Sequence, residues 1–309
     1  MRISILGIGS IGTLLGASLA QTNHEIHLHG RGERGARVIL EGLEVDGFGL
    51  GSHAAERFLH SVEELPLPEE LVAGSDVVII ASKAYDVVSL APLAATLLKE
   101  TGVAFALSNG LGHFQTLAQY VGQHRTLAAT TTHGAYKEIE GLVRWAGQGE
   151  LHLASTPFGP TPASVESLVQ LLESASLSPI LMPDADEMIW GKVLLNLSIN
   201  PLAALAGVKN GALLSAGLFD ACMAIYREAA KVARLERISV VDEAGFEHLL
   251  RQVLESTREN SCSMLQDIKR GRATEIESLN QAIVRIAEGH GLEVPVNQLM
   301  TSLILACHP

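Results

Sequence analysis

The spacing of hydrophobic and polar residues changes along the chain and divides it into two parts. Up to about residue 183, apolar or alternating runs typical of strands are separated by stretches with helical periodicity. Beyond that point only helical periodicity remains. We expect strands at 2–6, 25–29, 76–81, 103–107, 127–133, 142–145, 151–154 and 178–182, and helices at 13–21, 84–99, 161–174, 184–200, 213–235, 242–259, 261–270, 275–289 and 295–305.

This order of elements predicts an α/β protein with two domains. The run 77–81 is continuously apolar, as in a parallel strand that is buried on both faces, and 127–133, 142–145 and 151–154 are expected to extend the same sheet. We therefore expect a Rossmann-type dinucleotide-binding domain over residues 1–183 and an all-helical domain over 184–309, with ligands in the cleft between them. Thr274-Glu-Ile-Glu277 has capping-box spacing before one of the helices.

The first predicted strand leads directly into a glycine-rich turn, Gly7-Ile8-Gly9-Ser10-Ile11-Gly12, and then into a helix. In this context each glycine has a role: Gly7 permits the tight turn, Gly9 lets the backbone approach a pyrophosphate, and Gly12 allows close packing of helix on strand. The amino end of the helix would face the phosphates with N–H groups and a positive dipole. The pattern therefore predicts a dinucleotide site.

Residues after the next strand bear on the choice of dinucleotide. Arg31 follows the strand at 25–29 almost directly, where NAD sites usually carry an acid and NADP sites a cation. A guanidinium there favours NADP, whereas the alternative is a solvated loop in which Glu33 binds the ribose of NAD. Lys83 and Asn109 follow two further predicted strands at the same sheet edge. Lys83 is a candidate cofactor contact or a surface lysine, and Asn109 a ligand-facing amide or part of an ordinary Asn-Gly turn.

The helical half contains a polar face at four-residue spacing, formed by Lys192, Asn196 and Asn200. A helix places these three side chains within roughly 80° of one another. The residues between them are apolar apart from Ser198. Unpaired polar groups in such a setting are destabilising by about 1–3 kcal/mol each, so either the protein or a polar ligand must supply partners.

Composition narrows the class of protein. The 309 residues are 47% hydrophobic but only 4% aromatic, and the net charge of −12 makes nucleic acid an improbable partner. Three widely spaced cysteines predict neither a disulfide framework nor a metal site and suit a reducing cytoplasm. The apolar stretches 1–23 and 193–208 contain glycines, asparagines and a proline, so we expect no membrane segment.

Several other polar residues are candidates for a site. His133, at a predicted strand end, is either a catalytic acid or, as we favour, a histidine with structural partners. Asn210, Asn260, Ser263 and Glu275 are either exposed polar residues or ligands for the carboxylate and hydroxyl groups of an organic acid.

These motifs together resemble the ketopantoate reductase (2-dehydropantoate 2-reductase) family over essentially the whole chain. The resemblance rests on the glycine turn, Arg31, Lys83, Asn109-Gly110, the strand 130–133, the lysine–asparagine helix with Pro201, and the segment 259–267 followed by Glu275. It implies NADPH-dependent reduction of 2-dehydropantoate to (R)-pantoate, on the route to pantothenate and coenzyme A. It implies catalytic roles for Lys192 and Glu275, cofactor contacts from Gly7, Ile8, Gly9, Ser10, Ile11, Gly12, Arg31, Lys83 and Asn109, and substrate contacts from Asn109, Asn196, Asn200, Asn210, Asn260 and Ser263.

In that reaction Lys192 would stabilise the charge that grows on the ketone oxygen and deliver a proton to it. Three alternatives stay open: a reductase for another branched or hydroxylated 2-oxo acid, a sugar-acid or 3-hydroxyacid dehydrogenase, and a non-catalytic NADPH-binding protein. The expected partner is a small 2-oxo acid, and the chain is expected to be a monomer or a homodimer.

Overall fold

The computed structural model describes residues 1–139 and 141–307, apart from the side chain of Arg34. The chain divides into two compact units. The first unit consists of residues 1–108 and 112–185, and the second of residues 109–111 and 186–309. The short segment 109–111 therefore belongs with the helical part of the chain, although it follows a strand of the first unit.

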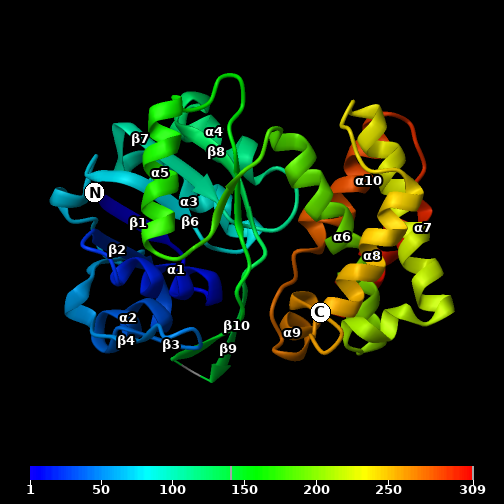
Figure 1. Ribbon diagram of the computed structural model, residues 1–309, viewed down its shortest axis with the longest axis horizontal. Helices are drawn as coiled ribbons and strands as arrows, with labels where there is room; N and C mark the ends of the chain where they lie inside the picture. Colours follow the sequence, from blue (N-terminus) through cyan, green and yellow to red (C-terminus); the bar gives the residue numbers. More distant parts are fainter. Residues whose placement is uncertain (140, 308–309) are drawn as a thin grey trace. The chain divides into compact units, whose positions relative to one another are not determined.

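Eight strands of the first unit form one sheet, in the order β12-β11-β8-β7-β6-β1-β2-β5 (Figure 1). From β8 to β5 in this order all neighbours pair in parallel, whereas β11 is antiparallel to β8. The strands are β1 (Arg2–Leu6), β2 (Glu25–Gly30), β5 (Leu59–Val62), β6 (Ser75–Ile80), β7 (Leu98–Ala106), β8 (Thr126–Thr131), β11 (Leu151–Ala154) and β12 (Pro179–Leu181). The predicted α/β class is confirmed.

Helices cover both faces of this sheet because successive side chains of a buried strand point to opposite sides. In β6, Val77 and Ile79 belong to the core beneath α1, α2 and α5, while Val78 and Ile80 belong to the core beneath α3 and α4. These helices are α1 (Ser10–Ala20), α2 (Gly32–Glu41), α3 (Val87–Leu97), α4 (His113–Val121) and α5 (Pro162–Ser174). The carboxyl ends of the parallel strands meet at one edge, which is where such sheets bind ligands.

A second sheet covers the outer side of α1. Its order is β4-β3-β10-β9, formed by β3 (Leu43–Asp46), β4 (Gly51–His53), β9 (Gly134–Ile139) and β10 (Leu142–Gly147). The prediction that residues 142–145 extend the main sheet was wrong. Val143 and Trp145 of β10 instead pack with Leu14 of α1, so this strand uses its apolar face against the helix.

Every regular element that the structure describes in residues 186–307 is helical. The α-helices are α6 (Ala185–Ala206), α7 (Ala216–Leu235), α8 (Glu243–Ser256), α9 (Ser263–Lys269), α10 (Asn280–Gly289) and α11 (Pro295–Ala306), and two short 3₁₀ turns are η5 (Asn210–Leu214) and η6 (Ile276–Ser278). Tyr226 of α7 stacks on Phe246 of α8, with ring centroids 3.7 Å apart. Most other buried side chains of this unit are aliphatic, so its core is a helical bundle with few aromatic contacts.

The first helix of this unit continues through Pro201, where the sequence predicted an end at residue 200. Proline has no N–H to donate to the carbonyl four residues earlier, so a helix that contains it leaves one carbonyl without its usual partner. Here the Leu197 carbonyl accepts a hydrogen bond of 3.3 Å from the Asn280 side chain. Asn280 also donates to Asn297 at 3.0 Å, which joins α6, α10 and α11 through buried amides.

The predicted capping box at 274–277 was also wrong. The Thr274 hydroxyl accepts from the N–H of Ile276, two residues on, whereas a capping box requires the N–H three residues on. As a result η6 precedes the helix, and α10 begins only at Asn280. Glu275 is therefore placed at a turn, where its side chain is available for other partners.

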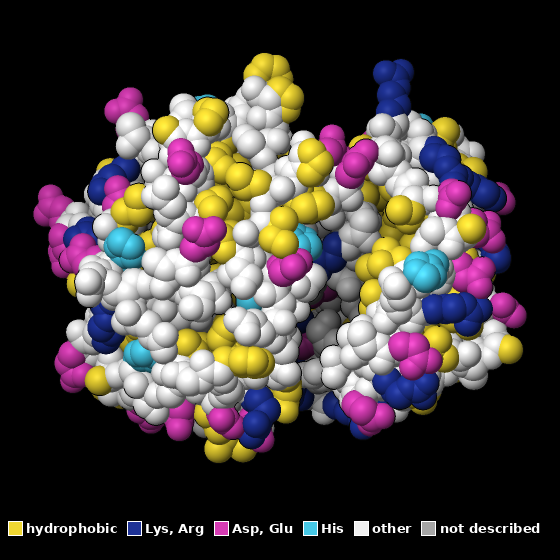
Figure 2. Space-filling view, viewed as in Figure 1, with side chains coloured by type: hydrophobic (Ala, Val, Ile, Leu, Met, Phe, Trp, Pro, Cys, Tyr) yellow, Lys and Arg dark blue, Asp and Glu magenta, His cyan; other side chains and the backbone are white. Residues whose placement is uncertain are grey.

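The long helix α6 is apolar enough to cross a membrane by length and composition. However, 72% of its most apolar stretch is buried inside the structure. The core helix of a soluble protein passes the same test. On the surface, acidic and basic side chains are interspersed over the faces of both units shown in Figure 2.

A row of buried polar side chains crosses the main sheet. The Ser4 hydroxyl lies 2.7 Å from both the Ser75 hydroxyl and His27 Nδ1, and His27 Nε2 lies 2.8 Å from the Ser61 hydroxyl. These contacts join β6, β1, β2 and β5. Burial lowers the pKa of His27 to about 3, and the positive charges of His29 and His60 act in the same direction. His27 is therefore neutral in the folded protein near pH 7.

This row predicts an acid-sensitive contribution to stability. In the unfolded chain His27 titrates near pH 6.5, so between about pH 6.5 and 3 the unfolded state binds a proton that the folded state excludes. We expect the part of the free energy of unfolding that depends on His27 to fall by about 2 kcal/mol between pH 7 and pH 5. Urea denaturation of the parent and of His27→Asn measures it, with His124→Asn at an exposed histidine as the control. Equal pH slopes in the parent and His27→Asn would contradict this assignment.

Candidate functional site

The turn after β1 has the geometry that a dinucleotide pyrophosphate requires. Gly7 adopts a φ of +98°, which side-chain-bearing residues rarely adopt, and its N–H donates to the carbonyl of His29. A Cβ on Gly12 would lie 1.9 Å from the Gly7 carbonyl oxygen, so close packing of α1 excludes any side chain there. Both glycines are thus required by the fold itself.

Gly9 differs, because nothing in the chain's own packing requires a glycine there. The nearest atom that a Cβ would meet is the Ala81 carbonyl oxygen, at 3.8 Å. Gly9 is the N-cap of α1, and the first turn of that helix contains no acidic residue. Backbone N–H groups at a helix start, without a side chain over them, are suited to bind phosphate. The turn therefore fits a dinucleotide.

The three other residues of the turn hold it against the sheet. Ile8 is buried, Ile11 packs on the core beneath α1, and Ser10 begins the helix. Lys83 follows β6 at the same edge of the sheet and is half-buried. Its position after β6 suits a phosphate or ribose contact, so the role of Lys83 in cofactor binding stays a prediction.

The carboxyl end of β2 carries charged groups of both signs. Arg31, the predicted partner of a 2′-phosphate, is exposed and forms an ion pair of 2.7 Å with Asp86. The N–H of Gly32, next along the chain, donates to Glu64 at 2.7 Å. Glu64 is not predicted from the sequence, because the strand before it, β5, contains two polar residues and lacks an apolar pattern.

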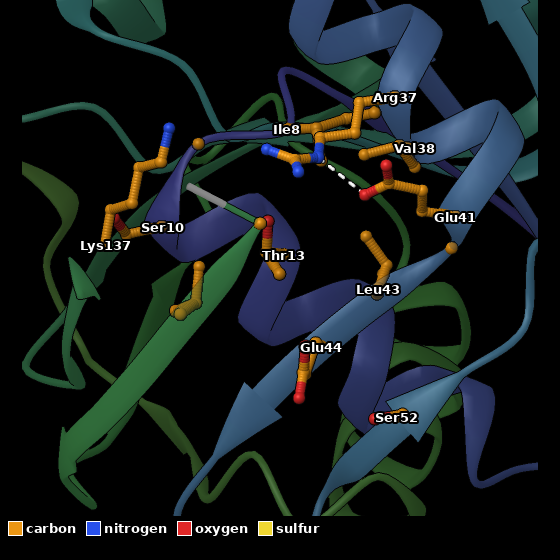
Figure 3. Close-up of a pocket in the computed structure, with 14 residues that line it drawn as sticks. Ile8, Ser10, Thr13, Arg37, Val38, Glu41, Leu43, Glu44, Ser52 and Lys137 are labelled. Carbon is orange, nitrogen blue, oxygen red and sulfur yellow. Dashed lines mark hydrogen bonds and ion pairs between the residues drawn. The ribbon is translucent and has the colours of Figure 1, made fainter. Parts of the chain in front are cut away.

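A cavity of about 210 Å³ adjoins the glycine turn on the side of α2 and the second sheet (Figure 3). Its wall includes Gly9 and Ser10, and Arg37 and Lys137 supply positive charge. Arg37 pairs with Glu41 at 2.6 Å, as the dashed line in Figure 3 marks. Arg37 therefore lines this cavity and pairs with a carboxylate of its own helix, whereas Arg31 pairs with Asp86.

The lysine–asparagine helix face is the centre of the second unit's candidate site. Lys192 is half-buried on α6, and Asn196 lies one turn further along. The Asn196 amide donates to the Asn109 side-chain oxygen at 3.5 Å, and Asn109 in turn donates to Glu275 at 3.0 Å. Three segments that are far apart in the sequence are thus brought together, and they contribute a cation, a carboxylate and two amides.

The segment that carries Asn109 is held firmly in this unit. The N–H of Leu111 donates to the Ser278 carbonyl at 2.8 Å, directly after η6. Gly110 has a φ of +108°, and a Cβ there would lie 2.3 Å from the same oxygen. The Asn-Gly pair is therefore more than a turn, because its glycine allows the backbone approach that positions Asn109 against Glu275.

The surroundings of Lys192 in this cluster bring its pKa closer to neutral pH. Burial lowers the pKa of Lys192 to about 8, and the negative charge of Glu275 opposes part of that change. Glu275 itself is buried. An amine with this pKa is mostly protonated at pH 7 but gives up its proton far more readily than a surface lysine.

The remaining predicted substrate residues gather near the other end of α6. The Asn210 N–H donates to the Asn260 carbonyl at 3.0 Å, and the Cys262 thiol lies 3.5 Å from the Asn200 carbonyl. Asn200 and Asn210 are buried, whereas Asn260 and Ser263 are exposed. Asn210 Oδ1 has no hydrogen-bond partner among the residues that the structure describes. This second group therefore offers one buried acceptor and two exposed polar groups.

His133 has partners on both ring nitrogens. Its Nδ1 accepts from the N–H of Gly149 at 3.0 Å, so Nε2 carries the proton and donates to the Leu177 carbonyl at 3.2 Å. Burial lowers its pKa, which keeps the ring neutral. These contacts assign His133 a structural role, the alternative that the sequence favoured.

The fold and these residues define the class of protein: a Rossmann-type dinucleotide-binding unit followed by a helical unit that carries a desolvated lysine. Residues 3–157 match the family model of ketopantoate reductase PanE/ApbA, and residues 184–308 match that of its C-terminal domain. The chain belongs to this ketopantoate reductase family. The resemblance seen in the sequence is confirmed.

Individual relatives span nearly the whole chain. The 2-dehydropantoate 2-reductase of Halobacterium salinarum is 34% identical over 98% of this chain and 98% of its own, and that of Archaeoglobus fulgidus is 31% identical over 98% and 96%. The ternary structure of D-mandelate dehydrogenase with NADH and anilino(oxo)acetate is 25% identical, covers 99% of this chain and 98% of its own, and has a TM-score of 0.90.

The lysine cluster predicts a measurable coupling between Lys192 and Glu275. Because the carboxylate favours the charged amine, Glu275→Gln should lower the pKa of Lys192 below its value of about 8, by about one pH unit or more. Carbon-13 NMR of lysine-labelled protein follows this titration, with the Lys192 signal assigned as the one that Lys192→Met loses. Glu277→Gln, which removes an exposed charge two residues away, is the control. A Lys192 titration that is the same in the parent and Glu275→Gln would show that the two groups do not interact.

Proposed function

We propose that the chain catalyses the NADPH-dependent reduction of 2-dehydropantoate to (R)-pantoate, a step toward pantothenate and coenzyme A, in the cytoplasm. Family membership and the names of the relatives support this reaction. The observation that carries the proposal is the cluster of a desolvated lysine, a buried carboxylate and two amides on α6 and its neighbours. In this proposal residues 1–183 bind the cofactor and residues 184–309 bind the substrate.

Cofactor binding is assigned to the sheet edge of the first unit. Gly7, Gly9 and Gly12 form the pyrophosphate turn, with Ile8, Ser10 and Ile11 between them. Arg31 and Lys83 complete the set at this edge, and Asn109, which belongs to the second unit, is assigned a further cofactor contact. When bound, the reduced nicotinamide supplies the hydride, and the remaining chemistry falls to the side chains of the protein.

Two tasks are assigned to Lys192: stabilising the charge on the ketone oxygen and donating a proton to it. Its ammonium stabilises the negative charge that develops on the ketone oxygen and donates the proton that completes the alcohol. With a pKa of about 8, the amine regains a proton from water at neutral pH. Glu275 keeps the amine charged before the reaction and either orients it or accepts the substrate hydroxyl. Asn109, Asn196, Asn200, Asn210, Asn260 and Ser263 are assigned to the carboxylate and hydroxyl groups of the substrate.

A second candidate is the reduction of another branched or hydroxylated 2-oxo acid. It is favoured by the similarity in structure to D-mandelate dehydrogenase, whose complex contains anilino(oxo)acetate. The same lysine chemistry would serve both substrates, so the difference lies in the polar groups around the acid. A non-catalytic NADPH-binding protein is the third alternative, but it gives no reason for the lysine cluster.

A panel of acids separates these candidates. A site built to bind a substrate hydroxyl leaves buried polar groups unpaired when that hydroxyl is missing. We expect kcat/KM for 2-dehydropantoate to exceed that for 2-oxo-3,3-dimethylbutanoate, which differs only by lacking the hydroxyl, by at least about 10³-fold. NADPH oxidation followed by absorbance measures both values, and phenylglyoxylate represents aromatic acids. A higher kcat/KM for phenylglyoxylate would support the second candidate, and no turnover with any acid would support the third.

The role of Lys192 predicts a split between catalysis and cofactor binding. Lys192→Ala should lower kcat with 2-dehydropantoate by about 10²- to 10⁴-fold, because it removes the proton donor and the charge beside the ketone. Its dissociation constant for NADPH, measured by fluorescence, should stay within about twofold of the parent. Lys209→Ala, at an exposed lysine of the same unit, is the control. Turnover of Lys192→Ala at the parent rate would remove this residue from the mechanism.

A further inference from the structure

Pairing of β2 with β5 places an acidic residue, Glu64, at the edge of the sheet where a cofactor's adenosine ribose is expected. The register opposes Gly30 to Val62, and the Glu63 N–H donates to the Gly30 carbonyl at 3.0 Å. Two residues beyond this pair, Gly32 and Glu64 come together, and the N–H of Gly32 donates to Glu64 Oε1 at 2.7 Å. A carboxylate that follows β5 therefore lies at the amino end of α2, although the residue that directly follows β2 in the sequence is Arg31 and not an acid.

Among the described side chains and backbone groups directly after β2, the Arg31 guanidinium and the Gly32 N–H each already hold a carboxylate. Arg31 pairs with Asp86 at 2.7 Å, and Gly32 is held by Glu64. The hydrogen bond from Gly32 and the nearby Arg31 lower the pKa of Glu64, so the group is ionised at neutral pH. A 2′-phosphate at this position would need the same donors and would meet two negative charges.

A ribose hydroxyl has the opposite requirement. It can donate a hydrogen bond to a carboxylate, which is why NAD sites place an acid at the end of the second strand. In this chain the acid would come from the neighbouring strand β5. Glu33, the alternative that the sequence suggested, lies on the first turn of α2, whereas Glu64 is the group whose hydrogen bond to the end of β2 is seen.

We propose that Glu64, assisted by Asp86, sets the choice between the two dinucleotides by competing with a 2′-phosphate for Arg31 and the Gly32 N–H. The chain then binds NADH with an affinity within about tenfold of that for NADPH, and Glu64 accepts the ribose 2′-hydroxyl of NADH. This inference rests on the proposed function, in that the glycine turn binds a nicotinamide dinucleotide. It does not depend on which 2-oxo acid is reduced.

Calorimetric titration of the full chain with NADPH and with NADH, without any keto acid, tests this inference. Glu64→Gln should raise the ratio of NADPH affinity to NADH affinity by about tenfold, through tighter NADPH and weaker NADH binding. Asp86→Asn, which frees Arg31, should raise the ratio several-fold by tightening NADPH binding. Both side chains are at the surface or half-buried, so neither change is expected to disturb the core.

Glu63→Gln is the matched control, because it removes the same charge from the adjacent exposed residue without touching the hydrogen bond to Gly32. The ratio in this variant should stay within about twofold of the parent. An unchanged ratio in Glu64→Gln, an equal change in Glu63→Gln, or a larger change in Glu33→Gln would overturn the inference.

The same titrations separate this inference from the proposed function. If both dinucleotides bind and Glu64→Gln shifts the ratio, but 2-dehydropantoate is not reduced, the substrate assignment fails and the inference stands. If neither dinucleotide binds the parent chain, both fail.

Discussion

The interaction on which the proposed chemistry of the second unit depends is the electrostatic one between the Lys192 ammonium and the Glu275 carboxylate. Burial that lowers a lysine pKa from 10.5 to about 8 corresponds to roughly 3 kcal/mol against the charged form. Without Glu275 that penalty would be larger and the pKa of Lys192 would be lower still. The carboxylate thus keeps the amine in the range where it is charged yet acidic enough to donate its proton.

Keeping this pair in place requires a rigid support, and the helical unit supplies one through buried amides. Pro201 would normally weaken α6 close to the site, but Asn280 satisfies the carbonyl that Pro201 leaves and joins the helix to α10 and α11. Glu275 is held by a different device, the hydroxyl turn at Thr274 and the backbone contact between Leu111 and Ser278. Asn280, Asn297 and Thr274 therefore help to position α6 and Glu275.

Features encoded in local spacing could be predicted from the sequence, whereas those that depend on contacts between distant segments could not. The glycine turn and the polar face of α6 follow from periods of a few residues, and the structure has both. The second sheet could not be predicted, because the apolar residues of β10 look the same whether the strand joins the main sheet or packs on α1, as it does here. Glu64 could not be predicted, because His60 and Ser61 interrupt the apolar pattern that would indicate the strand before it. The docking of residues 109–111 with the helical unit depends on a contact across more than 160 residues.

An acidic chain that binds anions must rely on local rather than overall charge. The net charge of −12 opposes both a dinucleotide and a 2-oxo acid at long range. At physiological ionic strength, however, charges on the surface are screened beyond about 8 Å, so the groups that touch the ligand decide its binding. Each unit meets this requirement with a cation whose charge is shared with a carboxylate: Arg31 with Asp86, and Lys192 with Glu275. At Lys192 the carboxylate favours the charged form of the amine, whereas at Arg31 we propose that it competes with a cofactor phosphate. In the proposed reaction, a carboxylate beside a cation would therefore support catalysis in one unit and adjust cofactor choice in the other.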